Sequence, residues 1–239
     1  MKRSIPVNPL TVITAILGAI GLGLRFWLNS CTDDRMLLPS WHISLVLLFI
    51  LTALTLGMLL LSTAAMEKAK YRLRLKYGIT RKIGAITGGL GLGAASVMAL
   101  LESPTGLALI VALLGFLTAV AIFLFGFRPN SKLSFPLLCC VTVFFMLYAV
   151  SRAQYWGTLP QIQRYFFPLM ALIFLVLTGY HRCELMVHAA YSRRFVFFNH
   201  AALFFCCVSL CEKDFLFYLG AACWLACDFT SVRLTKEEA

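Results

Sequence analysis

Long apolar runs separated by short polar segments are the main pattern along this chain. A helix needs roughly 20 apolar residues to cross a hydrocarbon core of about 30 Å. Runs close to that length predict eight membrane-spanning helices, which cover residues 10–28, 41–65, 83–101, 106–127, 133–150, 166–180, 195–211 and 215–229. The helical pattern of the sixth run continues towards Tyr191.

The last two runs are short and share a tight turn, Glu212-Lys213-Asp214. They allow either two full crossings or one hairpin that enters the membrane and returns on the same side. We favour two crossings. A count off by one would place some basic loops outside the cell.

The positions of lysine and arginine predict the orientation, because cytoplasmic loops of membrane proteins carry an excess of positive charge. If the N-terminus is cytoplasmic, every cytoplasmic segment is basic, and the outer segments hold only Arg35, Arg152, Arg164 and Lys213. The predicted fold class is therefore all-α: a polytopic integral membrane bundle of about eight transmembrane helices, with N- and C-termini in the cytoplasm.

The composition agrees with this class and excludes others. The chain is 61% hydrophobic and only 13% charged, whereas an average soluble domain is about 25% charged. A soluble globule and a disordered chain are both excluded. The net charge of +11 is spread over short loops, so it indicates topology rather than nucleic-acid binding. We expect one membrane domain over residues 1–239 in the plasma membrane, with the lipid bilayer as its partner. Another membrane or cytoplasmic subunit is a further expected partner, and no nucleic acid is.

Composition also divides the domain into a glycine-rich half, residues 1–127, and a Phe- and Cys-rich half, residues 128–239, with four spans each. Small residues let helices approach closely in lipid. We therefore expect the first half to form a tight bundle, with Gly84, Gly88, Gly89 and Gly93 at helix contacts. The second half should pack through bulky aromatic side chains.

One candidate site lies at the predicted cytoplasmic end of the sixth span. His181, Glu184 and His188 recur at i, i+3 and i+7, which places them on one helix face, and His200 enters from the same side on the next span. Imidazole and carboxylate groups at this spacing suit acid–base catalysis or, more weakly, a divalent metal. Because the spacing matches no zinc signature, we expect no metal and no other cofactor.

The alternative interpretation of this region is a polar helix end at the membrane boundary. In that case Arg182, Arg193 and Arg194 would extend to lipid phosphates while their stems stay in the apolar region. We favour this interpretation over a catalytic site.

A second candidate site lies on the predicted outer side. Arg25, Arg152, Trp156 and Arg164 could form a mouth for an anionic solute or lipid head group, because guanidinium groups bind phosphate and carboxylate in a bidentate manner. An interfacial anchor made of arginine and aromatic residues explains the same residues, and we favour it.

A third candidate is a basic segment in which Lys70, Arg72, Arg74 and Lys76 alternate with apolar residues. Each cation near an anionic leaflet contributes about 1 kcal/mol, so this segment should lie on the inner membrane surface. It could also dock a cytoplasmic partner.

Carboxylates are absent from the centres of all eight predicted spans. Proton-driven carriers use such groups as relays, so the sequence favours a transport-type component that handles a small solute or lipid without a carboxylate relay. The alternatives are a membrane-embedded enzyme with a His/Glu site at the cytoplasmic interface, and a structural or regulatory scaffold. A transporter should contain a polar-lined cavity, and an enzyme should gather its histidines around a pocket.

Overall fold

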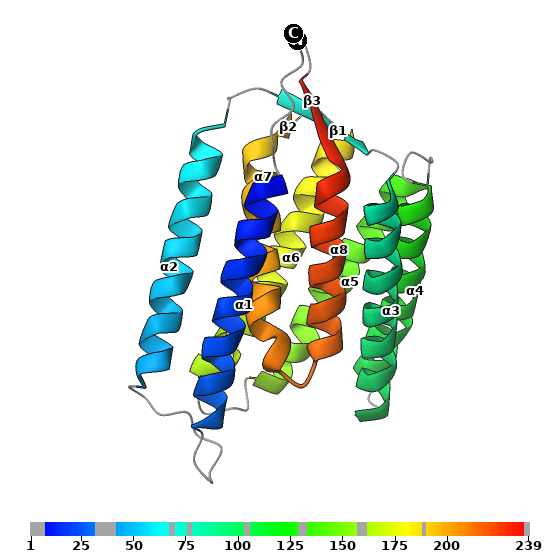
Figure 1. Ribbon diagram of the computed structural model, residues 1–239. Helices are drawn as coiled ribbons and strands as arrows, with labels where there is room; N and C mark the ends of the chain where they lie inside the picture. The colour runs from blue at the N-terminus through cyan, green and yellow to red at the C-terminus, as the bar shows by residue number, and fades with distance from the viewer. Residues whose placement is uncertain are drawn as a thin grey trace.

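The computed structural model describes residues 8–31, 42–66, 70–75, 78–102, 106–128, 133–156, 162–187 and 190–236. In this part of the chain, eight helices lie side by side and alternate in direction (Figure 1). They are α1 (Asn8–Ser30), α2 (Ile43–Ala64), α3 (Ile79–Glu102), α4 (Gly106–Phe127), α5 (Ser134–Trp156), α6 (Ile162–Val187), α7 (Ser192–Val208) and α8 (Phe215–Ser231). A short 3₁₀ helix, η1 (Ser209–Cys211), follows α7.

The predicted all-α, multi-span architecture is confirmed. Seven helices are long and apolar enough to cross a membrane, and the apolar stretch of the eighth, Phe215–Phe229, is shorter. α8 nevertheless runs from the η1 turn to the opposite end of the bundle (Figure 1). Its 17 residues correspond to about 26 Å at 1.5 Å per residue, close to the thickness of a hydrocarbon core. The arrangement therefore agrees with two crossings rather than a returning hairpin.

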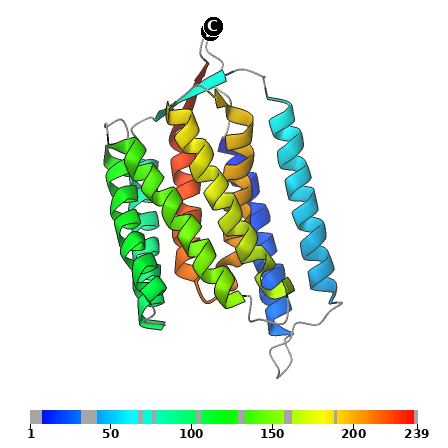
Figure 2. The same cartoon turned by 180° about the vertical axis from the view of Figure 1, so that it is seen from behind.

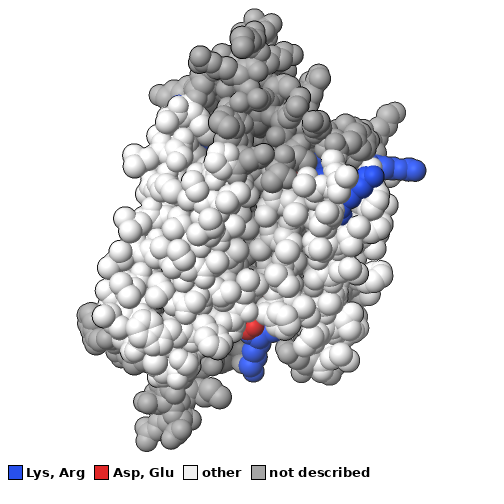
Figure 3. Space-filling view, viewed as in Figure 1, with Lys and Arg blue, Asp and Glu red and all other residues white. Residues whose placement is uncertain are grey.

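The outer surface of the bundle is apolar. Leu61, Leu90 and Leu101 are each at least 70% exposed, as expected where the surrounding solvent is lipid. On the face shown in Figure 3, charged residues lie toward the two ends and the region between them is uncharged. In a soluble protein an apolar surface of this size would cause aggregation or bind a partner. In a membrane protein the same surface is needed to contact lipid.

A small antiparallel sheet lies across one end of the bundle, where α1 begins and α8 ends (Figure 1). Its strands are β1 (Lys70–Leu75), β2 (Ala190–Tyr191) and β3 (Val232–Lys236), in the order β2-β1-β3. We call this end the sheet end and the opposite end, which carries η1, the turn end. The sheet was not predicted, although the alternating segment that begins at Lys70 has the period of a strand. The sixth helix, α6, ends at Val187, and the residues Ala190–Tyr191 form β2. The helix therefore does not continue to Tyr191 as predicted.

Six of the helices form a closed ring. From α3 to α8, each helix packs against the next along the chain, and α8 packs back against α3. α1 lies outside the ring against α7, and α2 packs on α1 and α7 at the edge (Figures 1 and 2). The α1–α2 pair and the α3–α4 pair therefore lie at opposite edges, and the first half does not form the separate tight bundle that we expected.

Part of the explanation is that several glycines of the first half face helices of the second half. A Cβ atom on Gly91 of α3 would lie 2.7 Å from the Cα atom of Gly220 on α8, and one on Gly88 would lie 2.7 Å from the Cβ atom of Trp224. On α1, a Cβ atom at Gly18 would lie 2.6 Å from Cys207 Cβ on α7. These small residues thus join the two halves to each other, whereas Gly89 and Gly93 face Ala119 of α4 within the first half.

The interior of the ring is packed with aromatic side chains, as predicted for the second half. Fully buried rings come mainly from α5 to α8, and include Phe144, Phe145, Tyr148, Phe167, Phe204, Phe205, Phe217 and Trp224. These rings are shielded from lipid. Their packing fixes the positions of the helices around the polar groups described next.

Candidate functional site

A buried carboxylate, Asp228 of α8, is shared by two buried arginines at the sheet end of the ring. Arg182 of α6 donates a hydrogen bond from Nη2 to Asp228 Oδ2, and Arg81 Nε of α3 lies 3.5 Å from Asp228 Oδ1. All three side chains are at most 2% exposed. The cluster therefore connects α3, α6 and α8. In the ring α6 is a neighbour of neither α3 nor α8.

Aromatic rings enclose both guanidinium groups. The Cζ atom of Arg182 lies 4.8 Å from the centroid of Trp224 and 5.6 Å from that of Phe195. Arg81 Cζ lies 4.5 Å from the centroid of Phe125, whose carbonyl oxygen accepts a hydrogen bond from Arg81 Nη2. A desolvated cation–π contact contributes about 2 kcal/mol, so these rings offset part of the cost of removing the charges from water.

This geometry corrects the interpretation in which Arg182 extends to lipid phosphates. The Arg182 side chain is fully buried, because Asp228 supplies an opposite charge inside the bundle. Arg193 is half-buried and its guanidinium donates to the carbonyl oxygen of Met66, whereas Arg194 is exposed. Only Arg194 has the exposure that the interfacial interpretation requires of all three.

In this cluster two guanidinium groups approach one carboxylate. Within the described residues, Arg182 Nε and Nη1 have no hydrogen-bond partner, and neither does the side-chain amide of Asn199, one turn after Phe195 on α7. Ion pairs this deep are costly to desolvate, and ionisable groups inside a membrane generally mark functional sites. We therefore take the Arg81–Asp228–Arg182 cluster, called the inner ion cluster below, as the principal candidate site.

A second group of ion pairs closes the turn end. Glu212 Oε1 lies 3.0 Å from Arg25 Nη2 of α1, and Asp214 accepts a hydrogen bond from Arg152 Nη2 of α5. Arg152 Nε also donates to the hydroxyl oxygen of Tyr148 over 3.3 Å. The turn between α7 and α8 is thus fixed to both α1 and α5, and we call these two pairs the turn-end pairs.

Aromatic contacts fill the space between the two charged layers. The rings of Tyr148 on α5 and Phe217 on α8 are stacked, with centroids 4.2 Å apart and an interplanar angle of 4°. Phe145 contacts both Phe217 and Trp224, at 6.0 Å and 6.2 Å between centroids. α8 is therefore held across the ring at the turn end, in the middle and at the sheet end.

The histidine candidates are only partly brought together. His181 Nδ1 and Glu184 Oε2 are hydrogen-bonded at 2.8 Å, and the His181 ring stacks on Phe198. His188 lies outside the described residues. His200 has different neighbours: its Nδ1 atom donates to the Val196 carbonyl oxygen over 2.7 Å.

The other nitrogen of His200 faces α1. Its Nε2 atom lies 3.2 Å from Thr11 Oγ1, and its ring meets Phe229 edge-on. Because a carbonyl oxygen only accepts, Nδ1 carries a proton. These contacts make His200 a link between α7 and α1. Groups of three or more potential metal ligands are not found in the described residues.

The residues proposed for an outer mouth lie at the turn end. Arg25 and Arg152 are the two arginines of the turn-end pairs, and each is engaged by a carboxylate of this chain. Trp156 is buried and stacks on Tyr165, with centroids 5.9 Å apart. Arg164 belongs to the first turn of α6, and its side chain lies outside the description. Binding of an external anion here stays a prediction, and it would have to displace Glu212 or Asp214.

The basic segment forms the central strand of the sheet. Lys70, Arg72 and Arg74 fall at alternate positions of β1, whereas Lys76 lies outside the described residues. Arg74 pairs with Arg233 of β3 across the ladder. The membrane-surface and docking interpretations of this segment stay predictions.

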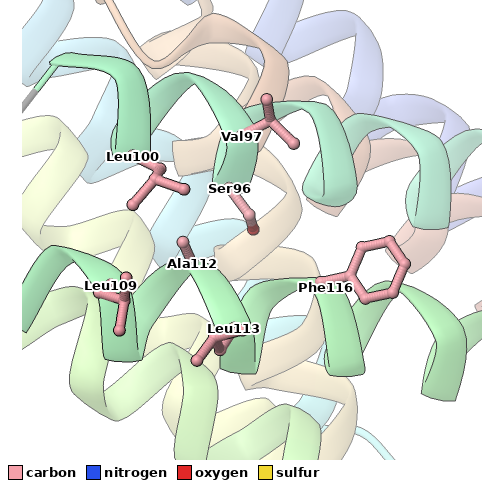
Figure 4. A pocket seen from close by; sticks show the side chains of 7 residues that line it. All are labelled: Ser96, Val97, Leu100, Leu109, Ala112, Leu113 and Phe116. Carbon is pink, nitrogen blue, oxygen red and sulfur yellow. The ribbon is translucent and has the colours of Figure 1, made fainter. Parts of the chain in front are cut away.

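Two surface hollows accompany these sites, and both are mainly apolar. One of about 190 Å³ lies between α3 and α4, and the side chains that line it are Ser96, Val97, Leu100, Leu109, Ala112, Leu113 and Phe116 (Figure 4). The other, of about 670 Å³, lies between α1 and η1, lined by Ala19, Leu22, Gly23, Phe26, Asn29, Leu210 and Cys211. Neither hollow contains a charged group, so neither is the polar cavity expected of an open transporter.

Sequence reasoning missed the inner ion cluster. A usable signal was present, because Asp228 is an acidic residue within a predicted span and such a residue requires a partner. The sequence did not indicate which basic residues would supply that partner, since Arg81 and Arg182 both fall in segments expected to face the cytoplasm.

The chain matches no protein-family model, no curated protein and no solved structure. Its function must therefore be inferred from the geometry of its own residues.

Proposed function

We propose that this chain is a transport-type membrane component, in which a small solute crosses along the axis of the α3–α8 ring. The observation that carries the proposal is the placement of ion pairs at both ends of α8, with stacked aromatic rings between them. Alternating access requires a barrier at each end of a path, which open at different times. In this interpretation, the inner ion cluster and the turn-end pairs are the two barriers, both in the closed state.

Ion pairs suit this role because they have two discrete states. In the closed state each carboxylate is paired with a guanidinium, and in the open state water can solvate both groups. A buried pair adds little stability compared with apolar packing of the same volume. A switching role therefore accounts for the charges better than a stabilising role does.

The charge balance limits the solute. A cation that reached the inner ion cluster would meet two guanidinium groups and a carboxylate that they already engage, whereas an anion or a neutral polar molecule would meet the guanidinium groups favourably. Asp228 is also already engaged by two arginines. It is therefore poorly suited to relay protons, and the solute gradient or a partner subunit would set the direction of transport.

A cysteine placed between the two barriers tests this proposal. Ala221 of α8 is fully buried and shares a helix face with Phe217 and Asp228, from which it is separated by four and seven residues. The Ala221→Cys variant is treated, in vesicles, with a negatively charged methanethiosulfonate added to one side at a time. Fragment-ion mass spectrometry, which separates residue 221 from Cys223 and Cys227 on the same peptide, reports the extent of modification, so the native cysteines need not be removed.

The two barriers should respond from opposite sides. Asp228→Asn should increase modification at position 221 several-fold from the side of the sheet end only, and Asp214→Asn from the side of the turn end only. Arg81→Gln, which retains the Arg182–Asp228 pair, is a milder second variant for the sheet end. Gly57→Cys on α2, where an added Cβ atom meets no neighbour, is the control whose modification should not change. Unchanged modification at position 221 in all three barrier variants, or an increase from the same side in all, would overturn the proposal.

A further inference from the structure

Two thiols on neighbouring helices lie close enough to react with each other. The Sγ atoms of Cys139 on α5 and Cys183 on α6 are 3.8 Å apart, and Thr142 Oγ1 lies 3.9 Å from Cys183 Sγ. A disulfide has a sulfur–sulfur bond of about 2.05 Å. To form this bond the two sulfur atoms must approach each other by about 1.8 Å. Rotation of the two cysteine side chains can supply that displacement.

The backbones of α5 and α6 are close at this point because a glycine faces a threonine. A Cβ atom on Gly179 would lie 2.5 Å from Thr142 Oγ1. Cys183 follows Gly179 by one helical turn, and Cys139 precedes Thr142 by about one turn. Because α5 and α6 run in opposite directions, both cysteines lie on the same side of this contact, toward the sheet end.

Both thiols are near the boundary of the membrane. Cys139 follows the first residue of α5 by five positions, and Cys183 precedes the last residue of α6 by four. At 1.5 Å per residue, each lies about 6 to 8 Å inside its helix end. Both residues are partly exposed, in contrast to Cys206 of α7, which is fully buried. A small oxidant can reach the pair without unfolding the bundle.

We propose that Cys139 and Cys183 form an oxidation site, which a hydroperoxide converts to a reversible disulfide between α5 and α6. The thiolate of one cysteine attacks a peroxide oxygen, the O–O bond breaks, and a sulfenic acid and one water form when hydrogen peroxide is the oxidant. The second sulfur then attacks the sulfenic sulfur, the S–OH bond breaks, and a second water leaves with the remaining thiol proton. Two thiols and one hydrogen peroxide thus give one disulfide and two waters. A dithiol reductant reverses the change by thiol–disulfide exchange.

The consequence is a covalent link between two neighbouring walls of the ring. Cys183 is adjacent in sequence to Arg182, whose side chain reaches Asp228 of α8. The disulfide would fix α6 to α5 next to the inner ion cluster and restrict any motion of α6. This inference does not depend on the proposed transport function, because it concerns a reaction of the thiols themselves.

Thiol counting in bilayer vesicles tests the inference. The full chain is exposed to micromolar hydrogen peroxide and quenched, and its free thiols are alkylated under denaturing conditions. The expected result is the loss of two of the nine thiols and a peptide pair joined through residues 139 and 183. Dithiothreitol should restore both thiols.

Matched variants identify the pair. Cys139→Ser and Cys183→Ser should each lower the yield of the cross-link at least ten-fold. Cys140→Ser, one position along α5, should leave the yield unchanged. The inference is overturned if residues 139 and 183 stay alkylatable after oxidation in the folded protein. It is equally overturned if the cross-link joins other cysteines, or if it forms only after detergent has unfolded the chain.

Discussion

The guanidinium group of Arg182 donates a hydrogen bond to the carboxylate of Asp228, 46 residues away along the chain. This contact spans the ring between α6 and α8, and both side chains are almost completely shielded. Arg81 approaches the other carboxylate oxygen from α3. One carboxylate therefore compensates two charges, and its removal has consequences that a surface pair would not have.

We expect Asp228→Asn to lower the free energy of unfolding by about 3–5 kcal/mol, because it removes the buried carboxylate that Arg182 and Arg81 approach. Unfolding in mixed micelles, followed by circular dichroism as the fraction of sodium dodecyl sulfate rises, measures this change. Glu184→Gln is the control. The Glu184 side chain is 42% exposed, and loss of its contact with His181 should cost about 1 kcal/mol or less. Equal losses in the two variants would contradict the assignment of Asp228 as the central counter-charge.

The contact between α3 and α8 should be sensitive to a single methyl group. Gly91→Ala would place a Cβ atom 2.7 Å from the Gly220 Cα atom and 3.0 Å from the Leu216 carbonyl oxygen. Backbone atoms cannot rotate away, so the helices must separate, at a cost of about 1–3 kcal/mol. The same unfolding assay measures the loss.

Gly57→Ala provides the control for this prediction, since a Cβ atom at residue 57 meets nothing within 4 Å. It should leave stability unchanged or raise it by up to about 1 kcal/mol, as alanine favours helix. A Gly91→Ala variant as stable as the Gly57→Ala variant would show that α3 and α8 are not in backbone contact.

Tyr148 has two separable contacts, the stack on Phe217 and the hydrogen bond from Arg152. Tyr148→Phe retains the ring, so it should cost only the hydrogen bond, about 0.5–1.5 kcal/mol. Tyr148→Leu also removes the aromatic pair, which is worth about 0.5–1.5 kcal/mol beyond its buried area. Thermal unfolding in detergent should therefore rank the wild type above the phenylalanine variant and both above the leucine variant. A leucine variant as stable as the phenylalanine variant would contradict the importance of the stack.

The orientation predicted from the basic loops can be tested at two exposed lysines. Lys82 lies toward the sheet end and Lys213 in the turn between α7 and α8. With the sheet end in the cytoplasm, a membrane-impermeant maleimide added to intact cells should modify a Lys213→Cys variant. It should modify a Lys82→Cys variant only after permeabilisation, with peptide mass spectrometry as the readout. The reverse pattern would invert the orientation, and with it the sides assigned to the two barriers.

The extent of the spans was largely predictable from the sequence. The fourth predicted span, residues 106–127, has the bounds of α4, and the other predicted spans overlap their helices with shifts at the ends. The shifts are largest where polar residues continue a helix beyond its apolar run, as in α5, which extends past residue 150 to Trp156. Apolar length predicts the portion of a helix in lipid, but it does not predict where the helix itself ends.

The candidate site was less predictable. Glu184 was correctly placed near His181, because residues three positions apart on one helix are neighbours whatever the tertiary structure. The approach of His200 to that pair depends on the rotation of α7, and the structure turns His200 toward Thr11 of α1. The partners of Asp228 likewise lie on α3 and α6, which no local pattern connects to α8.

The sequence by itself determined that this chain crosses a membrane several times, because transfer into lipid is the sum of contributions that each residue makes independently of its partners. It also determined that basic residues gather in alternate loops. Only the tertiary structure decided that Gly88 and Gly91 of α3 face α8, that a small sheet lies across one end, and that Asp228 meets Arg81 and Arg182. Each of these depends on which helix faces come together, and a glycine, a strand edge or a carboxylate can be satisfied by many partners until packing selects one.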